Sequence, residues 1–223
     1  MVEENQHKLA THIVALNYFS LIFIIIGGTF AYYLGDGALM QTAYFLLWIY
    51  LVPPVLTRII IIAFGKPTGI VNITSNTHTL WWVLFQLQLI FNRFHFLEEA
   101  LRVVPGIYAL WLNLWGAKVN MFSFWGPGVT VMDRYHLVIG KGVILGTGCL
   151  LSAHVLIKKP DGELFLIIDK LTIDADALIG VRSTLSPGCH IHSSQSVAAQ
   201  NVLKPYTEIK EGKKSYLKII GYK

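Results

Sequence analysis

The chain has 223 residues, of which 54% are hydrophobic and only 14% are charged, and its formal net charge is +5. Disordered chains combine low hydrophobicity with high charge, and soluble domains carry about a quarter charged residues. The composition therefore excludes disorder and argues against a wholly soluble protein. The basic residues gather late in the chain without any motif of nucleic-acid recognition, so no nucleic acid is expected as a partner.

Two long apolar segments come first in the chain. Residues 13–34 carry no charge, and residues 38–64 form a second apolar segment that contains Pro53 and Pro54. Because about 20 apolar residues in a helix cross the hydrocarbon core of a bilayer, we expect two transmembrane helices. The short loop between them carries Asp36, whereas Lys66 and most other basic residues follow the second segment. The positive-inside rule then predicts a multi-pass protein of the inner or plasma membrane whose later residues are cytoplasmic.

Residues 79–119 are rich in aromatic residues but more polar than the first two segments. Trp81 and Trp82 suit the headgroup level of a bilayer, so this stretch is expected to form interfacial helices. Whether residues 79–95 span the membrane or lie on it is left open by their composition. Residues 1–119 are thus interpreted as a membrane-anchoring helical region.

A six-residue repeat dominates the last third of the chain. An aliphatic residue recurs every six positions, with one interruption, at Ile139, Leu145, Leu151, Ile157, Ile167, Ile173, Ile179, Leu185, Ile191, Val197 and Leu203. Helices and flat strands have side-chain periods of 3.6 and 2, so neither explains this spacing. A three-sided solenoid does, because each hexad forms one face and the aliphatic residues stack inside. We expect this domain over residues 120–210, followed by a basic tail at 211–223.

The frame of the repeat also predicts the positions of its two cysteines. Cys149 and Cys189 fall at inward corners and are expected to be packing residues. Two cysteines without a CxxC spacing do not make a disulfide framework, so a reducing compartment is expected.

The interruption between Ile157 and Ile167 predicts a small hairpin or loop that protrudes from one corner of the coil. Counting three hexads per coil across it places the hexad of Leu151 over that of Ile173. This register predicts a column of side chains about 4.8 Å apart, composed of His136, His154, Asp176 and Ser194. A histidine beside a carboxylate suits general-base chemistry, so His154 and Asp176 are the candidate catalytic residues. The alternative is a surface histidine on the edge of the solenoid.

The segments VIGKGVILGTGCLLSAHV and IDADALIGVRSTLSPGCHI resemble the hexapeptide-repeat acyltransferases, a family with a left-handed parallel β-helix. The resemblance covers about residues 131–204. The preceding apolar region is similar to a membrane-anchored branch that includes the C-terminal region of poly-lysine-synthetase-like enzymes. The usual C-terminal helix of the family is not recognisable here. The resemblance implies N-terminal transmembrane and interfacial α-helices followed by a left-handed parallel β-helix, assembled as a homotrimer.

The same resemblance implies a membrane-bound acyltransferase. Its donor would be acyl-CoA, with acetyl-CoA as the first expectation, or an acyl carrier protein, and no metal is expected. The acceptor would be a hydroxyl or amine of a lipid-linked, saccharide or peptide molecule, deprotonated by His154. The residues expected to bind the donor or stabilise its oxyanion are Gly180, Arg182, Ser183 and Lys204.

Three other readings remain open from the sequence. The first is a non-catalytic trimeric scaffold on a membrane anchor. The second is a γ-type carbonic anhydrase, for which His190 and His192 would both point outward around Ile191 but lack an obvious third histidine. The third is a module that acts with a separate peptide-assembly enzyme.

Overall fold

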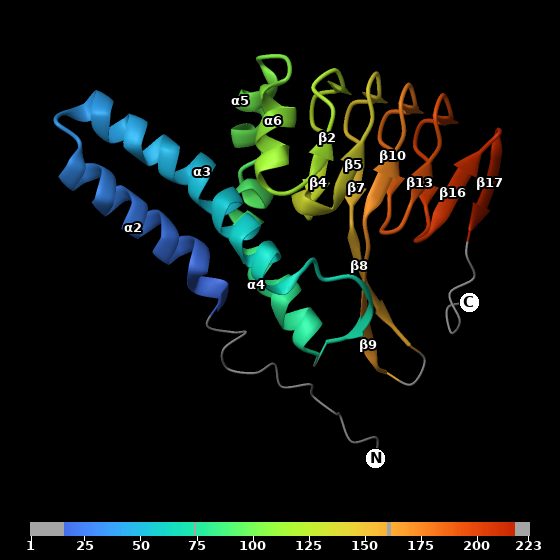
Figure 1. Cartoon of the computed structure of the whole chain (residues 1–223), viewed down its shortest axis with the longest axis horizontal. Helices are drawn as coiled ribbons and strands as arrows, with labels where there is room; N and C mark the ends of the chain where they lie inside the picture. Colours follow the sequence, from blue (N-terminus) through green and yellow to red (C-terminus); the bar gives the residue numbers. More distant parts are fainter. Residues whose placement is uncertain (1–15, 74, 160–161, 217–223) are drawn as a thin grey trace.

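Two long helices form an antiparallel pair at the N-terminal side of the computed structural model, which describes residues 16–73, 75–159 and 162–216 (Figure 1). A short 3-10 turn, η1 (Leu16–Tyr18), leads into α2 (Phe19–Leu34), and α3 (Ala38–Phe64) continues through both of its prolines. Residues 13–15 of the first expected span lie outside the described residues. By length and composition both helices could cross a membrane, and less than a quarter of either apolar stretch is buried within the chain.

Three more helices follow in the described residues: α4 (Asn76–Arg93), α5 (Phe96–Arg102) and α6 (Ile107–Leu114). They pack into one hydrophobic core with the start of the strand-rich region, and Phe91, Leu112 and Trp115 are fully buried in it. Trp81 differs from the headgroup position expected for it. It is only 5% exposed, and its indole N–H donates to the buried carboxylate of Asp133 inside the protein.

Most strands after α6 belong to three sheets of short parallel strands. One contains β2 (Lys118–Val119), β5 (Leu137–Ile139), β10 (Leu171–Ile173), β13 (His190–Ile191) and β16 (Thr207–Lys210), with β17 (Lys213–Tyr216) antiparallel at its end. The second contains β3 (Phe124–Trp125), β6 (Ile144–Leu145), β11 (Leu178–Ile179) and β14 (Ser196–Val197). The third contains β4 (Thr130–Met132), β7 (Leu150–Ser152), β12 (Thr184–Leu185) and β15 (Val202–Leu203).

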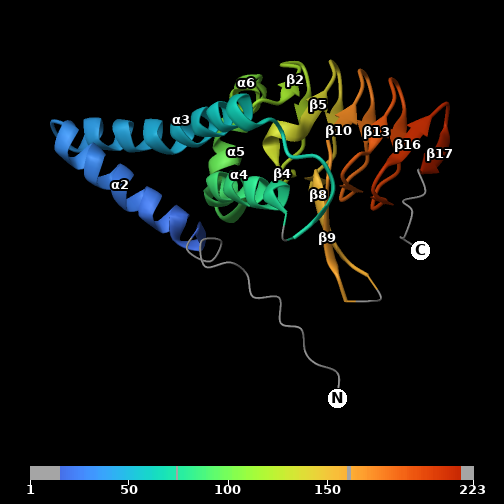
Figure 2. The same ribbon diagram turned by 60° about the horizontal axis from the view of Figure 1, so that its bottom comes forward.

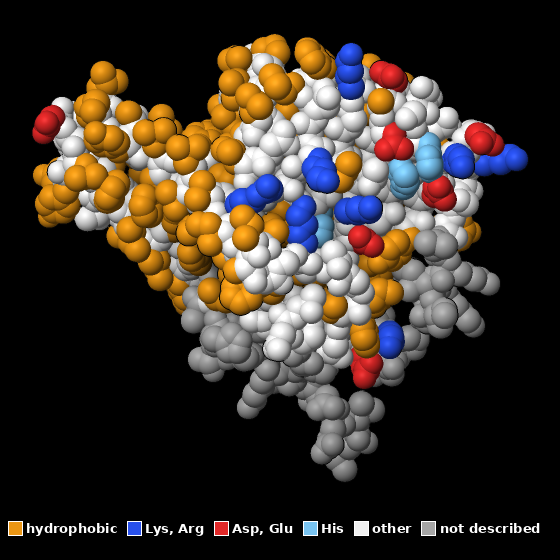
Figure 3. All heavy atoms as spheres, viewed as in Figure 1, with side chains coloured by type: hydrophobic (Ala, Val, Ile, Leu, Met, Phe, Trp, Pro, Cys, Tyr) orange, Lys and Arg blue, Asp and Glu red, His pale blue; other side chains and the backbone are white. Residues whose placement is uncertain are grey.

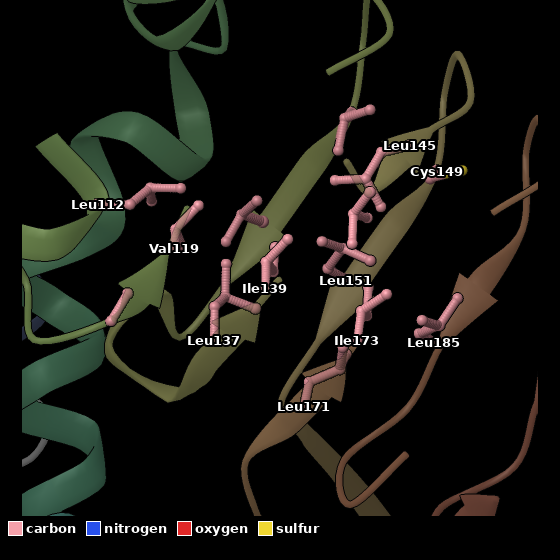
Figure 4. Close-up of a cluster of buried hydrophobic side chains, with 14 of the residues drawn as sticks. Leu112, Val119, Leu137, Ile139, Leu145, Cys149, Leu151, Leu171, Ile173 and Leu185 are labelled. Carbon is pink, nitrogen blue, oxygen red and sulfur yellow. The ribbon is translucent and has the colours of Figure 1, made fainter. Parts of the chain in front are cut away.

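These sheets are the three faces of a coil. The chain visits them in rotation, and each strand pairs in parallel with the strand one coil earlier, so that Ile139, Ile173 and Ile191 stack. Figures 1 and 2 show the successive coils as a row of short strands that runs away from the helices. The aliphatic side chains point into the coil and form its core, which includes Leu145, Leu151 and Leu185 (Figure 4). Cys149 and Cys189 are buried free thiols, as their corner positions predicted.

The register differs from the expected one at the interruption. Nine of the eleven repeat positions are buried inside the coil, but Ile157 and Ile167 belong to a hairpin of β8 (His154–Lys158) and β9 (Leu164–Ile168). Leu151 therefore stacks on Leu185 of the next coil instead of on Ile173. The reason is that β8 and β9 pair with each other in antiparallel fashion, which satisfies their backbone groups outside the coil. Of the loop that joins them, residues 160–161 lie outside the described residues.

The hairpin joins the two parts of the molecule. β1 (Gly69–Asn72), which follows α3, pairs in antiparallel fashion with β9 and completes a three-stranded sheet with the order β1-β9-β8. In both views the hairpin extends from the solenoid on the side of α4 (Figures 1 and 2). The segment after the second long helix is thus held against the hairpin that interrupts the coil.

Candidate functional site

His154 is the first residue of β8, at the point where the chain leaves the coil for the hairpin. Its Nδ1 bonds to Oδ2 of Asp133, a side chain with no exposed surface. The other carboxylate oxygen of Asp133 accepts a hydrogen bond of 2.9 Å from Nε1 of Trp81 on α4. The carboxylate therefore joins the helical part to the solenoid and fixes the orientation of the imidazole.

Two departures from the six-residue spacing bring Asp133 and His154 together. Val131 stacks on Leu151 in adjacent coils, and each is followed by extra residues before the next coil strand. After Val131 the insertion is the short 3-10 turn η2 (Arg134–His136), which Asp133 starts with a φ of 58°. Aspartate tolerates this left-handed conformation better than most residues. The two insertions leave the coil at one corner, so the two side chains meet.

The electrostatics of the pair favour a charged interaction. Burial alone lowers the pKa of His154, but the charge and hydrogen bond of Asp133 outweigh it and raise the pKa above the ordinary 6.5. Burial alone raises the pKa of Asp133, and the charge and hydrogen bond of His154 outweigh it in turn, so that this pKa lies below its usual value. Because Nδ1 is bound to the carboxylate, Nε2 is the ring nitrogen left to accept a proton from a bound molecule.

An apolar pocket of about 590 Å³ opens beside the imidazole. One wall comes from α4 and the other from the β8–β9 hairpin. The ring centroid of His154 lies 4.8 Å from that of Trp81 and 5.6 Å from that of Phe85. The remaining lining residues are mostly aliphatic or aromatic and are Ile73, His78, Trp82, Val155, Leu156, Leu164 and Leu166. A base inside an apolar pocket suits a reaction on a molecule with an extended apolar part.

A buried polar network supports this corner from the helical side. Nε of Arg134 lies 2.8 Å from Oε1 of Glu98 on α5. The backbone N–H of Arg134 donates to Oε1 of Gln88 at 2.7 Å. Arg134 is fully buried, and Nη1 also donates to Oδ1 of Asn92 at 2.9 Å. The hydroxyl of Tyr108 completes the network with a 3.1 Å hydrogen bond to Glu98. Since Arg134 follows Asp133 directly, the network holds the turn that carries the carboxylate.

The predicted column of side chains does not form. Asp176 is exposed in a turn between the first and second sheets, where it stacks on Gly142 and not on His154. Ser194 follows Asp176 one coil later, and its N–H donates to the carbonyl of residue 175. His136 is buried, and its Nε2 bonds to the carbonyl of Pro67 at 2.9 Å. The assignment of Asp176 as partner of His154 is corrected to Asp133, because the hairpin shifts the register of the coil.

The residues expected to bind a donor fall at two different corners. Gly180, Arg182 and Ser183 lie between the second and third sheets, at the other end of the third sheet from His154. Ser183 is buried, and its hydroxyl donates to the carbonyl of residue 198 at 2.9 Å, so it does not face a bound molecule. Gly180 packs under the next coil, where a Cβ would lie 2.4 Å from a backbone nitrogen. Arg182 is exposed at that corner.

Lys204 shares the corner of His154. It follows Leu203, which stacks on Leu185 and through it on Leu151, so it lies two coils along from Ser152. Two strand spacings separate the backbones of Lys204 and Ser152 by about 10 Å. The hydroxyl of Ser152 in turn donates to the carbonyl of His154 at 2.7 Å. Among the expected donor-binding residues, Lys204 is the exposed cation on the side of the candidate base.

Sequence reasoning missed Asp133 and Trp81. A signal for Asp133 was present, because eight positions instead of six separate Val131 from Ile139, the same kind of break that marks His154. For Trp81 no spacing rule exists, since its contact with the carboxylate joins residues 52 positions apart.

Neither protein-family models nor curated proteins match the chain. Among solved structures, a hexapeptide-repeat acetyltransferase from Vibrio cholerae O1 biovar eltor, complexed with acetyl coenzyme A, is similar over 43% of this chain at 21% identity and a TM-score of 0.34. The chain spans 56% of that protein's length.

Two serine acetyltransferases match over more of the chain but less well. The one from Neisseria gonorrhoeae has 14% identity and a TM-score of 0.24, with 91% of this chain and 84% of that chain covered. Isoform 3 from Entamoeba histolytica, in complex with cysteine, has 13% identity and a TM-score of 0.19, with 92% and 75% covered.

Proposed function

We propose that the chain is a membrane-bound acyltransferase in which His154 is the general base and Asp133 orients it. The observation that carries the proposal is the pairing of a histidine and a buried carboxylate at the mouth of an apolar pocket, where two insertions leave a six-residue coil. In agreement with the resemblance stated above, we propose a left-handed coil and a homotrimer with the donor in a groove between protomers.

The chemistry needs one proton acceptor and one site for a thioester. Nε2 of His154 takes the proton from the hydroxyl or amine of the acceptor as that atom attacks the acyl carbonyl. The bond between the carbonyl carbon and sulfur then breaks, and the imidazolium returns the proton to the departing CoA thiolate. Asp133 stabilises the imidazolium between these two steps, which is the state that its buried negative charge favours.

The donor proposed here is acyl-CoA, with acetyl-CoA as the simplest member and an acyl carrier protein as the alternative. Support comes from Lys204, an exposed cation about two coils from the base along the same corner. Lysine is a common partner of phosphate groups, of which CoA carries several. Arg182 lies at the neighbouring corner and suits a donor that crosses the third face of the coil.

The pocket favours an acceptor with an alkyl chain, such as a lipid-linked hydroxyl or amine. Its lining is almost wholly apolar, and each buried methylene group contributes about 0.8 kcal/mol to binding. The pocket also lies where the solenoid meets the helical part, and the exposed apolar side chains of α2 and α3 suit a bilayer (Figure 3). A chain entering from the membrane would place its polar end at the imidazole.

The orientation proposed is a multi-pass anchor with the solenoid in the cytoplasm. Arg58 near the end of α3 and Lys118 at the start of the solenoid lie close enough to Lys66 to lower its pKa, after the larger effect of burial. Figure 3 shows basic side chains gathered on this face between the helices and the coil. Such a cluster at one end of a spanning helix agrees with the positive-inside rule.

The proposal is tested with the full chain in detergent micelles, supplied with radiolabelled acetyl-CoA and a total lipid extract. We expect label in a lipid-soluble product, loss of that label in His154→Gln, and normal incorporation in a control variant at an exposed histidine of the helical part, His95→Gln. Incorporation by the wild type at the level of a protein-free control would instead favour a scaffold without catalysis, and equal incorporation above that level in His154→Gln would show that His154 is not the base. Mass spectrometry of the labelled product would identify the acceptor.

A further inference from the structure

A second cluster of histidines and carboxylates lies on the outer surface of the sheet that contains β10, β13 and β16. Asp174, His190 and His192 place one potential ligand atom each within 4.8 Å of one another. Oδ2 of Asp174 is 2.8 Å from Nε2 of His190 and 3.9 Å from Nδ1 of His192. All three side chains are partly exposed, so an ion from solution could reach them.

The register of the coil produces this convergence. Ile173 stacks on Ile191, which brings the following residues, Asp174 and His192, side by side on adjacent strands. His190 and His192 flank the buried Ile191, so both point outward, as strand alternation requires. Their rings stack with centroids 4.0 Å apart and planes 24° apart. The positions are therefore fixed by backbone pairing on both sides and do not depend on a flexible loop.

A fourth residue sets the orientation of one histidine. Glu208 lies on the next coil, where it is the register partner of His190. Its Oε1 is 2.6 Å from Nε2 of His192. Because that nitrogen donates its proton to the carboxylate, the lone pair of His192 is on Nδ1, the atom that faces Asp174. A histidine held by a carboxylate through its second nitrogen is the usual arrangement of a metal ligand.

We propose that Asp174, His190 and His192 bind one divalent transition-metal ion of the zinc class, with Glu208 as a positioning residue for His192. Two imidazoles and one carboxylate are a common ligand set for zinc, with a water molecule in the fourth position. At bond lengths of about 2.0–2.2 Å the ligand atoms of a tetrahedral site lie roughly 3.4 Å apart. The two distances to Asp174, 2.8 and 3.9 Å, bracket this value, and the three ligand atoms lie within 4.8 Å of one another. Binding would require the two stacked rings to turn about their side-chain bonds, so that both lone pairs point at one ion.

The expected role of the ion is to hold consecutive coils together. Its ligands come from the coils of β10 and β13, and Glu208 belongs to the coil of β16. A solenoid is stabilised by contacts between neighbouring repeats, so a metal that bridges them should raise the unfolding temperature. The cluster lies on another face from the His154 pocket, and this inference does not depend on the proposed acyl transfer. It also departs from the expectation, stated with the family resemblance, that no metal is bound.

The test uses the full chain without an affinity tag, in detergent micelles, after removal of metals with a chelator. Titration with zinc chloride in a calorimeter should show one ion per chain and a rise in the unfolding temperature. His192→Gln should weaken binding at least 100-fold and abolish the rise, whereas Glu208→Gln should weaken binding about 10- to 100-fold. The control His95→Gln removes an exposed histidine on the helical side and should bind as the wild type does.

Three results would overturn the proposal. One is binding in the wild type no tighter than in His192→Gln, which would leave the cluster as a set of exposed hydrogen bonds. The second is one ion for two or three chains, which would mean that different copies share the ligands. The third is loss of binding in His95→Gln. If His192→Gln fails to fold, as judged by circular dichroism, Asp174→Asn takes its place, with the same loss of binding expected.

Discussion

Replacing Asp133 with asparagine tests the proposed base without removing it. The amide oxygen can keep the 2.9 Å hydrogen bond from Trp81, so the side chain should remain in place. The amide nitrogen would then face Nδ1 of His154 and donate to it. This moves the ring proton to Nε2, the atom that must accept the proton of the acceptor. We expect kcat to fall by about 10²- to 10⁴-fold, the range that general-base catalysis supplies.

The pH profile separates this role from a structural one. In the wild type, activity should rise as His154 loses its proton, at a pH above the ordinary histidine pKa of 6.5, because Asp133 raises that pKa. In Asp133→Asn the charge is gone, so the acidic limb of the residual activity should move to lower pH. KM should change little, since the Asp133 side chain has no exposed surface and cannot touch a substrate. Initial rates of acyl transfer across the pH range measure all three effects.

Asp176→Asn is the matched comparison, because it makes the same chemical change at the carboxylate that sequence spacing had assigned. Asp176 is exposed and stacks on Gly142, at a different corner of the coil from the hairpin. We expect near wild-type kcat for this variant. An unchanged kcat and acidic limb in Asp133→Asn, or a large loss in Asp176→Asn, would refute the reasoning.

Three further variants test the surroundings of the site. Arg134→Met leaves the buried Glu98 with Arg102 at 3.7 Å as its remaining cation and should lower the free energy of unfolding by about 3 kcal/mol. Lys159→Met, at an exposed pair, should change it by about 1 kcal/mol or less in the same denaturant titration. Leu164→Trp fills part of the pocket and should raise KM for an acceptor with an alkyl chain roughly tenfold, because about two methylene groups of that acceptor would no longer be buried. An unchanged KM would mean that the alkyl chain binds elsewhere. The His154–Asp133 pair stabilises the fold fully at a pH below the pKa of histidine in the unfolded chain, and this stabilisation is lost as the pH rises through the higher pKa of the folded state. His154→Gln should therefore lower the melting temperature more at about pH 6 than at about pH 9. An equal loss at both pH values would contradict the pairing.

The spacing of aliphatic residues predicted the coil because the coil itself imposes that spacing. A side chain that recurs every six residues can stack inside only if each hexad forms one face, and nine of the eleven positions do so. The two that do not, Ile157 and Ile167, match the six-residue spacing by coincidence, because both belong to the hairpin. Local sequence cannot tell whether such a strand pairs along the coil or with its own hairpin partner. That choice depends on pairing between distant segments, here with β1.

The helical region was harder to predict for a related reason. Tryptophan suits both a membrane interface and a protein core, because its ring is apolar and its N–H is polar. For Trp81 the decisive factor is a buried carboxylate that accepts this N–H, and the carboxylate comes from the solenoid. The sequence of the helix alone contains no trace of this partner. His154 was identifiable, in contrast, because a break in the repeat marks its position directly.

The site therefore belongs to the contact between the two parts of the molecule and not to the solenoid alone. The coil supplies Asp133 and His154, but the second hydrogen bond to the carboxylate and one wall of the pocket come from α4. Lys66, two residues after the end of α3, donates to the carbonyl of Tyr135 at 2.5 Å and so holds the turn η2, which follows Asp133. Lys66 and α4 thus connect the helical part, whose two long helices are apolar enough to cross a membrane, to the geometry of the candidate base. Under the proposed function, this coupling gives a physical reason for acyl transfer to take place at a membrane surface, where an acceptor with an alkyl chain would be found.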